Sequence, residues 1–144
     1  MLENSIEDIC NYVHGIISTH GSAEYIEIKA FVDVLPLNHY PRTYPFASYV
    51  INVQGATAGH KDMRDKIWCV TIPFGDYSGG SLALYEAGVV VEKGVGDVII
   101  FPSSLFTHFN LDFEGIRCSL ILFSDRHGDD WAEGRNGWNE FMVV

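Results

Sequence analysis

The chain has few basic residues. Nine lysines and arginines stand against 19 aspartates and glutamates in 144 residues, so the formal net charge is −10. This balance argues against a surface built mainly to hold phosphate backbones or anionic membranes, although it leaves room for a small basic patch. Long apolar runs are absent as well, since no segment approaches the ~20 residues that span a bilayer, and the acidic N-terminal segment is unlike a secretory signal. We therefore expect an intracellular protein, cytoplasmic or nuclear, with no membrane partner.

Cysteine is scarce too. Cys10, Cys69 and Cys118 are an odd number at wide spacing, and two of them lie in apolar strand-like runs, where free thiols pack as small hydrophobic groups. Disulfides are not expected, which favours a reducing compartment. Hydrophobic residues make up 47% of the chain, enough for one sizeable core, while 144 residues leave no space for a second. The composition therefore predicts one domain, residues 1–144.

The N-terminal segment has the pattern of an amphipathic helix over about residues 5–19. Its apolar residues recur at spacings of three and four: Ile6, Ile9, Cys10, Val13, Ile16 and Ile17. Ser5 stands where an N-cap is expected, and Gly21 where the helix would stop. Because the following sequence has the texture of strands, we expect this helix to pack against the outside of a sheet.

After Gly21, short runs rich in Val, Ile, Tyr and Phe are broken by turn residues at intervals of about ten. The predicted strands span about 24–34, 46–54, 57–62, 67–74, 81–85, 88–92, 97–101, 106–111 and 115–124. The Gly-rich run 75–80 is predicted to be a turn. The pattern indicates a mainly β fold, a double-sheet jelly roll or cupin-like barrel. The tail, 125–144, would pack back on the barrel or contact another copy, which leaves a homo-oligomer open.

Two histidines and an aspartate form the most informative chemical pattern. His60 and Asp62 would share one face of an extended segment, because strand side chains alternate, and His108 follows downstream. Two imidazoles and one carboxylate on one face of Fe(II) leave three positions free for a co-substrate and dioxygen. A His-x-Asp pair alone is weak evidence, since His127-Gly128-Asp129 is a second one, but only the first has a later histidine. For His108 a hydrogen-bonded core position stays open.

Arg117 and Ser119 share one face of an otherwise apolar run at 116–123. If that face is interior, Arg117 brings a permanent charge into a buried space, which is costly unless an anion binds there. A guanidinium matches the geometry of a carboxylate, and a serine hydroxyl adds one donor. An exposed Arg117, or one paired with a neighbouring acidic residue, stays open.

The order His-x-Asp, distal His, Arg-x-Ser resembles the signature of the iron(II)- and 2-oxoglutarate-dependent oxygenases. The stretch from about 46 to 124 looks like the double-stranded β-helix core of that family. Trp68-Cys69-Val70-Thr71-Ile72-Pro73-Phe74-Gly75 and Gly115-Ile116-Arg117-Cys118-Ser119 look like short fungal members related to the branch that oxidises methylated bases. Collagen-type prolyl hydroxylases usually carry Lys where this chain has Arg117, so they are the less similar branch.

The resemblance implies a role for each of these residues. It assigns His60, Asp62 and His108 to Fe(II) and to catalysis, and Arg117 with Ser119 to the distal carboxylate of 2-oxoglutarate. Asn52, on the strand before the metal pair, is a further candidate for a co-substrate contact, because related enzymes often place an amide or a tyrosine there. Tyr49, three residues earlier on the same run, would face the other way on a regular strand. Each of these roles is assigned to its residue separately.

The implied activity is that of a dioxygenase, which uses O2 and 2-oxoglutarate to hydroxylate a substrate and releases succinate and CO2. A nucleic-acid base, a protein side chain and a small metabolite all stay open as substrates. Two other classes also remain. A cupin-like jelly roll would bind a metal or a small acid without oxidising anything, and a partner-binding barrel would carry its histidines incidentally.

Overall fold

A computed structural model describes residues 2–34, 40–56, 58–127 and 129. The chain divides into two compact units, a helical unit (Met1–Ser48 with Ser124–Val144) and a strand unit (Tyr49–Phe123). The predicted single domain stays a prediction, and most of the tail at 125–144 lies outside the described residues. Within the described part of the chain, no helix has the length and apolar character needed to cross a membrane.

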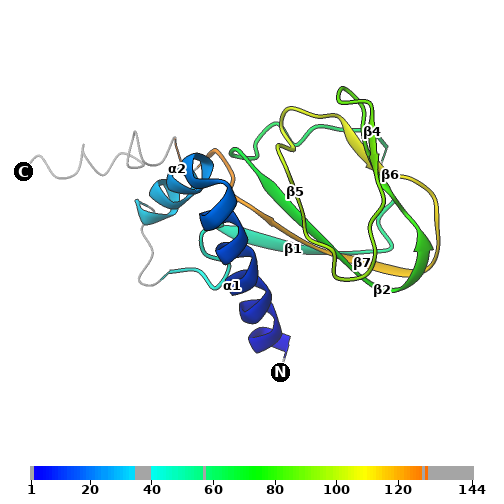
Figure 1. Ribbon diagram of the computed structural model, residues 1–144, viewed down its shortest axis with the longest axis horizontal. Coiled ribbons are helices and arrows are strands. Elements are labelled where there is room, and N and C mark those ends of the chain that lie inside the picture. The colour runs from blue at the N-terminus through cyan, green and yellow to red at the C-terminus, as the bar shows by residue number, and fades with distance from the viewer. Residues whose placement is uncertain (1, 35–39, 57, 128, 130–144) are drawn as a thin grey trace, which may run out of the picture. The chain divides into compact units, whose positions relative to one another are not determined.

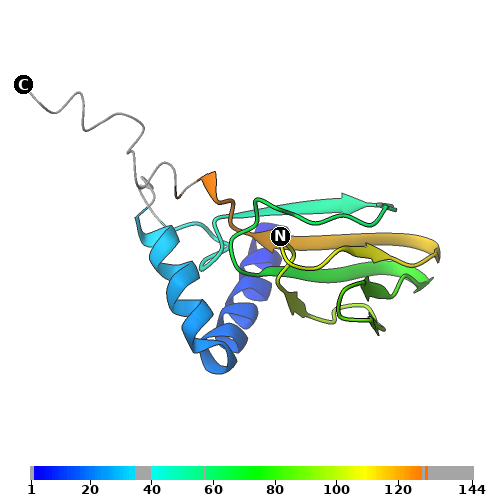
Figure 2. The same ribbon diagram turned by 90° about the horizontal axis from the view of Figure 1, so that it is seen from above.

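The helical unit contains two helices, α1 (Leu2–His20) and α2 (Ser22–Asp33), which meet in a V (Figure 2). The predicted helix is confirmed, but it begins before Ser5 and so has no N-cap there. Cys10, Val13 and Ile17 of its apolar stripe are buried. The packing of this helix on the outside of a sheet stays a prediction.

The strand predicted at 24–34 is wrong, because this segment is α2. Alternation over the first residues of the segment suggests a strand. The buried residues, however, are Ile28, Phe31 and Val32, whose spacing of three and four is helical. Glu24 in the first turn also favours a helix, since it faces the positive end of the helix dipole.

The strand unit holds two sheets, and Figure 1 shows its strands curled around a common interior. The sheets have strand orders β1-β7-β2-β5 and β4-β3-β6. The bounds are β1 Ser48–Val53, β2 Cys69–Gly79, β3 Leu82–Leu84, β4 Val89–Val91, β5 Ile99–Phe101, β6 His108–Asn110 and β7 Phe113–Phe123. β2 pairs antiparallel with β5 and β7, and β3 with β4 and β6. The predicted double-stranded β-helix is confirmed.

The core of this unit joins the two sheets. Cys69 of β2, Leu82 of β3 and Phe101 of β5 are buried together, and Ile121 of β7 packs against them. Burial raises the pKa of the Cys69 thiol, so it behaves as the small apolar group that its sequence context predicts. All three cysteines are free thiols, as expected.

Two local predictions are wrong. The segment predicted as strand 57–62 makes only an isolated bridge between His60 and His108. The Gly-rich run predicted as a turn instead continues β2 to Gly79, paired with β7. Gly75 explains the second error: its φ is +120°, and a Cβ would collide with the carbonyl oxygen of Ile116 across the pair. The glycine permits close approach of two long strands there, not a chain reversal.

Candidate metal centre and cavity

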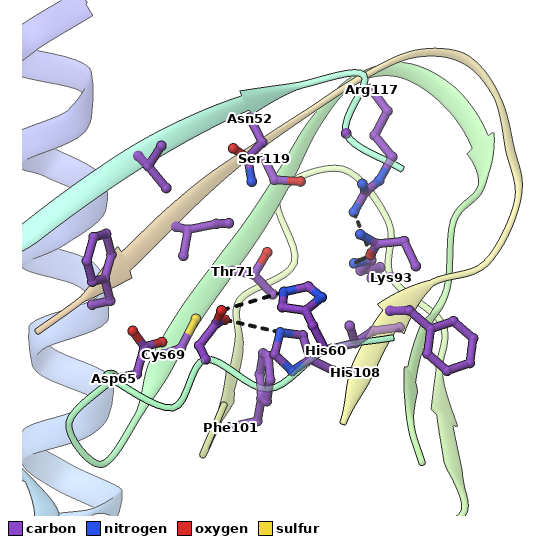
Figure 3. A pocket seen from close by; sticks show the side chains of 18 residues that line it. Asn52, His60, Asp65, Cys69, Thr71, Lys93, Phe101, His108, Arg117 and Ser119 are labelled. Carbon is purple, nitrogen blue, oxygen red and sulfur yellow. Dashed lines mark hydrogen bonds and ion pairs between the residues drawn. The ribbon is translucent and has the colours of Figure 1, made fainter. Parts of the chain in front are cut away.

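His60, Asp62 and His108 converge at one point, as Figure 3 shows for the two rings. One ligand atom from each lies within 4.8 Å of the others. The Asp62 carboxylate oxygens are 3.6 Å from His60 Nε2 and 3.3 Å from His108 Nε2. Metal bonds of ~2 Å place donor atoms roughly 3 to 4 Å apart, so these carboxylate distances match a shared ion. Among the described residues this is the one such cluster, and the pair at 127 and 129 is not part of it.

Main-chain hydrogen bonds bring the three residues together. The His60 N–H donates to the His108 carbonyl at 3.2 Å, and the His108 N–H donates back to His60 at 2.9 Å. The Asp62 N–H donates to the Ser103 carbonyl at 3.1 Å. Next to this bridge, a Cβ on Gly59 would lie 3.2 Å from the Thr107 methyl group, so the two segments are closely packed. The site is therefore fixed by backbone contacts between segments far apart in sequence.

Both imidazoles are oriented by their own backbone. Nδ1 of His60 lies 2.9 Å from the Ala58 carbonyl oxygen, and Nδ1 of His108 lies 2.9 Å from that of Phe106. A carbonyl accepts only, so each Nδ1 carries the hydrogen in the neutral ring and each Nε2 keeps its lone pair. Both Nε2 atoms face the Asp62 carboxylate. This is the tautomer that a metal requires.

The carboxylate is held in its charged form. When His108 is protonated, its Nε2 donates a hydrogen bond to Asp62 that lowers the pKa of this carboxyl, and burial opposes this only in part. Burial acts to lower the pKa of His108, but its hydrogen bonds to Asp62 and Phe106 outweigh that effect and raise it. The site thus presents a negative oxygen between two imidazole nitrogens, a donor set suited to a divalent cation.

Arg117 lies inside the barrel, as one of the sequence readings predicts. Its residue is 3% exposed on β7, and its Nη2 donates to Asn110 Oδ1 at 3.2 Å. The guanidinium carbon is 5.6 Å from the ring centres of Tyr77 and Phe113. Its Nε is buried with no hydrogen-bond partner among the described residues. A buried cation with an unused donor is an arrangement that an anion would complete.

Ser119 and Asn52 reach the same space. Ser119 is buried two residues along β7 from Arg117, and its side chain lines the cavity (Figure 3). Asn52, on the exposed strand β1, also lines the cavity, whereas Tyr49 of the same strand does not. The structure therefore brings all six predicted site residues to one cavity, while their roles stay predictions.

The cavity lies between the two sheets and has a volume of about 270 Å³. His60 and His108 line one part of it, and Arg117 reaches into another (Figure 3). Leu82, Phe101 and Ile121 supply apolar wall. Fe(II) fits the two nitrogens and one oxygen of the cluster, and the carboxylate of a dicarboxylate fits the unused donor of Arg117.

Lys93 is a cavity residue that the sequence reading misses. It is 6% exposed, and its Nζ donates to Asn110 Oδ1 at 2.5 Å. Burial, and then the charge of Arg117, lowers the pKa of Lys93 to about 8. In the sequence it stands between Glu92 and Gly94 after a short strand, where a lysine looks like part of a solvated turn. No local signal distinguishes it.

Glu86 is a second missed residue, and it links the two segments that carry the metal ligands. Its carboxylate accepts hydrogen bonds from the Thr107 N–H at 2.6 Å and the Thr107 hydroxyl at 2.8 Å. The same carboxylate pairs with Lys61 Nζ at 2.8 Å. Lys61 separates two of the ligands and Thr107 precedes the third, so one carboxylate braces both segments.

No protein-family model matches the chain, and no curated protein matches it. Among solved structures, the chain is similar to NgTET1 in complex with 5mC DNA, with a TM-score of 0.73 and 20% identity over 85% of this chain and 49% of that one. It also aligns with an oxidoreductase of the 2OG-Fe(II) oxygenase family from Burkholderia pseudomallei, with a TM-score of 0.46 and 24% identity over 60% of this chain and 50% of that one. The chain thus spans about half the length of each. The first of these likenesses shows that the chain shares the fold of the aligned half of NgTET1.

Proposed function

We propose that the chain is an Fe(II)- and 2-oxoglutarate-dependent dioxygenase. The observation that carries the proposal is one cavity with two complementary ends. A His, Asp, His cluster with both Nε2 atoms available lies at one end, and Arg117 with its unused Nε lies at the other. A metal site alone would suit any cupin-like protein, whereas a buried guanidinium with an unused donor favours an anionic ligand as well.

In this proposal, His60, Asp62 and His108 hold Fe(II), and Asp62 supplies the negative charge that offsets part of the cation's. Arg117 and Ser119 take the distal carboxylate of 2-oxoglutarate, and Asn52 contacts the co-substrate from β1. With O2, the bound iron and 2-oxoglutarate supply the oxidising chemistry that yields succinate, CO2 and a hydroxylated product. The protein orients these groups, and the apolar wall of the cavity excludes water from them.

The likeness to NgTET1, a protein solved in complex with 5mC DNA, supports a nucleic-acid base as the substrate class ahead of a protein side chain or a metabolite. The net charge of −10 counts against an extensive interface with a long duplex. We therefore propose that recognition rests on the base itself, with few phosphate contacts.

An anaerobic titration tests the reaction class. Fe(II) and then 2-oxoglutarate are added to the protein, and the visible charge-transfer band of the chelate is followed before O2 is admitted and succinate is measured. The band, followed by succinate, is the expected result. Metal binding without the band and without succinate would instead identify a cupin-like metal binder. Absence of metal binding would favour a partner-binding barrel.

A further inference from the structure

Two buried cations share one neutral acceptor at the anionic end of the cavity. Lys93 Nζ and Arg117 Nη2 both donate to the amide oxygen of Asn110. The two residues are 6% and 3% exposed. Within the described part of the chain, neither forms an ion pair with a carboxylate. Figure 3 shows the ends of their side chains in the same part of the cavity.

Such a pair is costly in the absence of an anion. Burial penalises each charge, and two like charges around one oxygen repel each other. The lowered pKa of Lys93, with burial as its main cause and Arg117 as the second, has the same origin. The rings of Tyr77 and Phe113 offset part of the cost for Arg117, but Lys93 has no such contact among the described residues. A methionine would fill the space of Lys93 without this penalty, so the charge itself requires an explanation.

The surroundings hold both cations in place. The hydroxyl of Tyr77, whose ring lies near Arg117, donates to the backbone carbonyl of Lys93 at 3.3 Å. Gly80 leaves room beside Arg117, because a Cβ there would lie 3.2 Å from Nε and 3.3 Å from Cδ. The two side chains are therefore positioned together, and the unused donor of Arg117 stays in this space.

We propose that Lys93 and Arg117 form a two-cation subsite for the distal carboxylate of a dicarboxylate ligand, with Lys93 as a specificity-determining residue. The identity of that ligand as 2-oxoglutarate rests on the proposed function. One carboxylate oxygen accepts from the guanidinium and the hydroxyl of Ser119, and the other accepts from the ammonium group of Lys93. The subsite consequently selects ligands by the charge at their far end.

Two ligands separate this role from simple packing. The Mn(II)-loaded protein is titrated calorimetrically under nitrogen with 2-oxoglutarate, and with 2-oxopentanoate, which has a methyl group in place of the distal carboxylate. Lys93→Met should weaken 2-oxoglutarate on the order of tenfold to a hundredfold and leave 2-oxopentanoate unchanged. Lys93→Gln should behave in the same way. Lys29→Met, which removes the same charge from α2, should change neither affinity.

Thermal unfolding gives a second readout. Without ligand, Lys93→Met should melt no lower than the wild type, because it removes an unpaired buried cation. Glutarate, which has both carboxylates but no keto group, should raise the melting temperature of the wild type more than that of the variant, even without metal. The glutarate experiment tests the role of Lys93 independently of the oxygenase proposal, because it needs no metal. Failure of the oxygenase proposal would be seen separately, as 2-oxoglutarate binding that Mn(II) does not enhance.

Three results would overturn the two-cation subsite. They are unchanged 2-oxoglutarate and glutarate binding in Lys93→Met, an equal loss for both 2-oxo acids with a lower melting temperature, and a wild type that binds neither 2-oxoglutarate nor glutarate. The first would leave Arg117 as the sole anion ligand. The second would make Lys93 a packing residue, and the third would remove the anion site itself.

Discussion

His60 and His108 exchange two backbone hydrogen bonds, although one precedes β2 and the other begins β6. This bridge brings their rings to a centroid distance of 4.5 Å. Because the main chain fixes the pair, changes to the side chains of the site should affect metal and ligand binding more than folding.

Replacing Asp62 tests which His-x-Asp pair serves the metal. Asp62→Ala should abolish Fe(II)-dependent succinate production, since it removes the one carboxylate of the cluster. His127→Ala and Asp129→Ala should keep activity near the wild-type level. Succinate formed by each variant, with circular dichroism as a check of folding, decides between the pairs. Folded tail variants without activity would show that the wrong pair is assigned.

Replacing Arg117 should separate co-substrate from metal. Arg117→Ala should weaken 2-oxoglutarate by roughly 2 to 5 kcal/mol, because it removes a charge-assisted pair in a partly dry cavity, and should change Fe(II) affinity little. Ser119→Ala should cost about 1 kcal/mol, the contribution of one hydrogen bond. Calorimetry under nitrogen measures both affinities. Unchanged 2-oxoglutarate affinity in Arg117→Ala would favour the cupin-like alternative.

Glu86 should act on the metal through the two segments it braces. Glu86→Gln loses the charge that pairs with Lys61 and weakens the acceptor for Thr107, so metal affinity should fall a few-fold while the ligand set is intact. Glu92→Gln, an exposed glutamate after β4, removes the same charge as a control. Competition with a metal-sensitive dye compares the two. Equal metal affinities in the two variants would mean that Glu86 does not support the metal ligands.

Two glycines provide a matched pair. Gly80 and Gly88 have φ of +73° and +63°, so alanine at either should cost about 1 kcal/mol of stability. Only at Gly80 would the new Cβ press on the Arg117 side chain, at 3.2 Å from Nε, whereas Gly88 faces open space. Gly80→Ala should therefore also weaken 2-oxoglutarate, and Gly88→Ala should not. Similar affinities in the two variants would count against a positioned guanidinium.

The pKa of Lys93 gives a pH dependence. Burial and Arg117 lower it to about 8 from 10.5, so the unfolded chain binds more protons than the folded one between these values. The free energy of unfolding of the ligand-free protein should gain a contribution that rises with pH from about 8 to 10.5. Urea unfolding of the wild type and Lys93→Met across this range should show the rise in the wild type alone. Parallel curves would mean that Lys93 is solvated.

The sequence predicts the strands of the barrel because period-two alternation is a local signal, and the six candidate site residues all line one cavity, while their roles stay predictions. His60 reaches the cluster with Asp62 and His108 even though its segment is not a regular strand, since one bridge suffices to orient it. α2 is missed because its early alternation imitates a strand. Lys93 is missed for a deeper reason: the fold alone buries it, and its neighbours in the cavity come from β6 and β7.

The shared oxygen of Asn110 has a consequence for how the barrel is held together. Filled by a dicarboxylate, the space between Lys93 and Arg117 would become an electrically balanced network that ties β6 and β7 to the turn after β4. Without the dicarboxylate, the two cations repel each other. The co-substrate would therefore form part of the interior packing of the barrel. In each turnover, its release would weaken the contacts between β6, β7 and the turn after β4, and its rebinding would restore them.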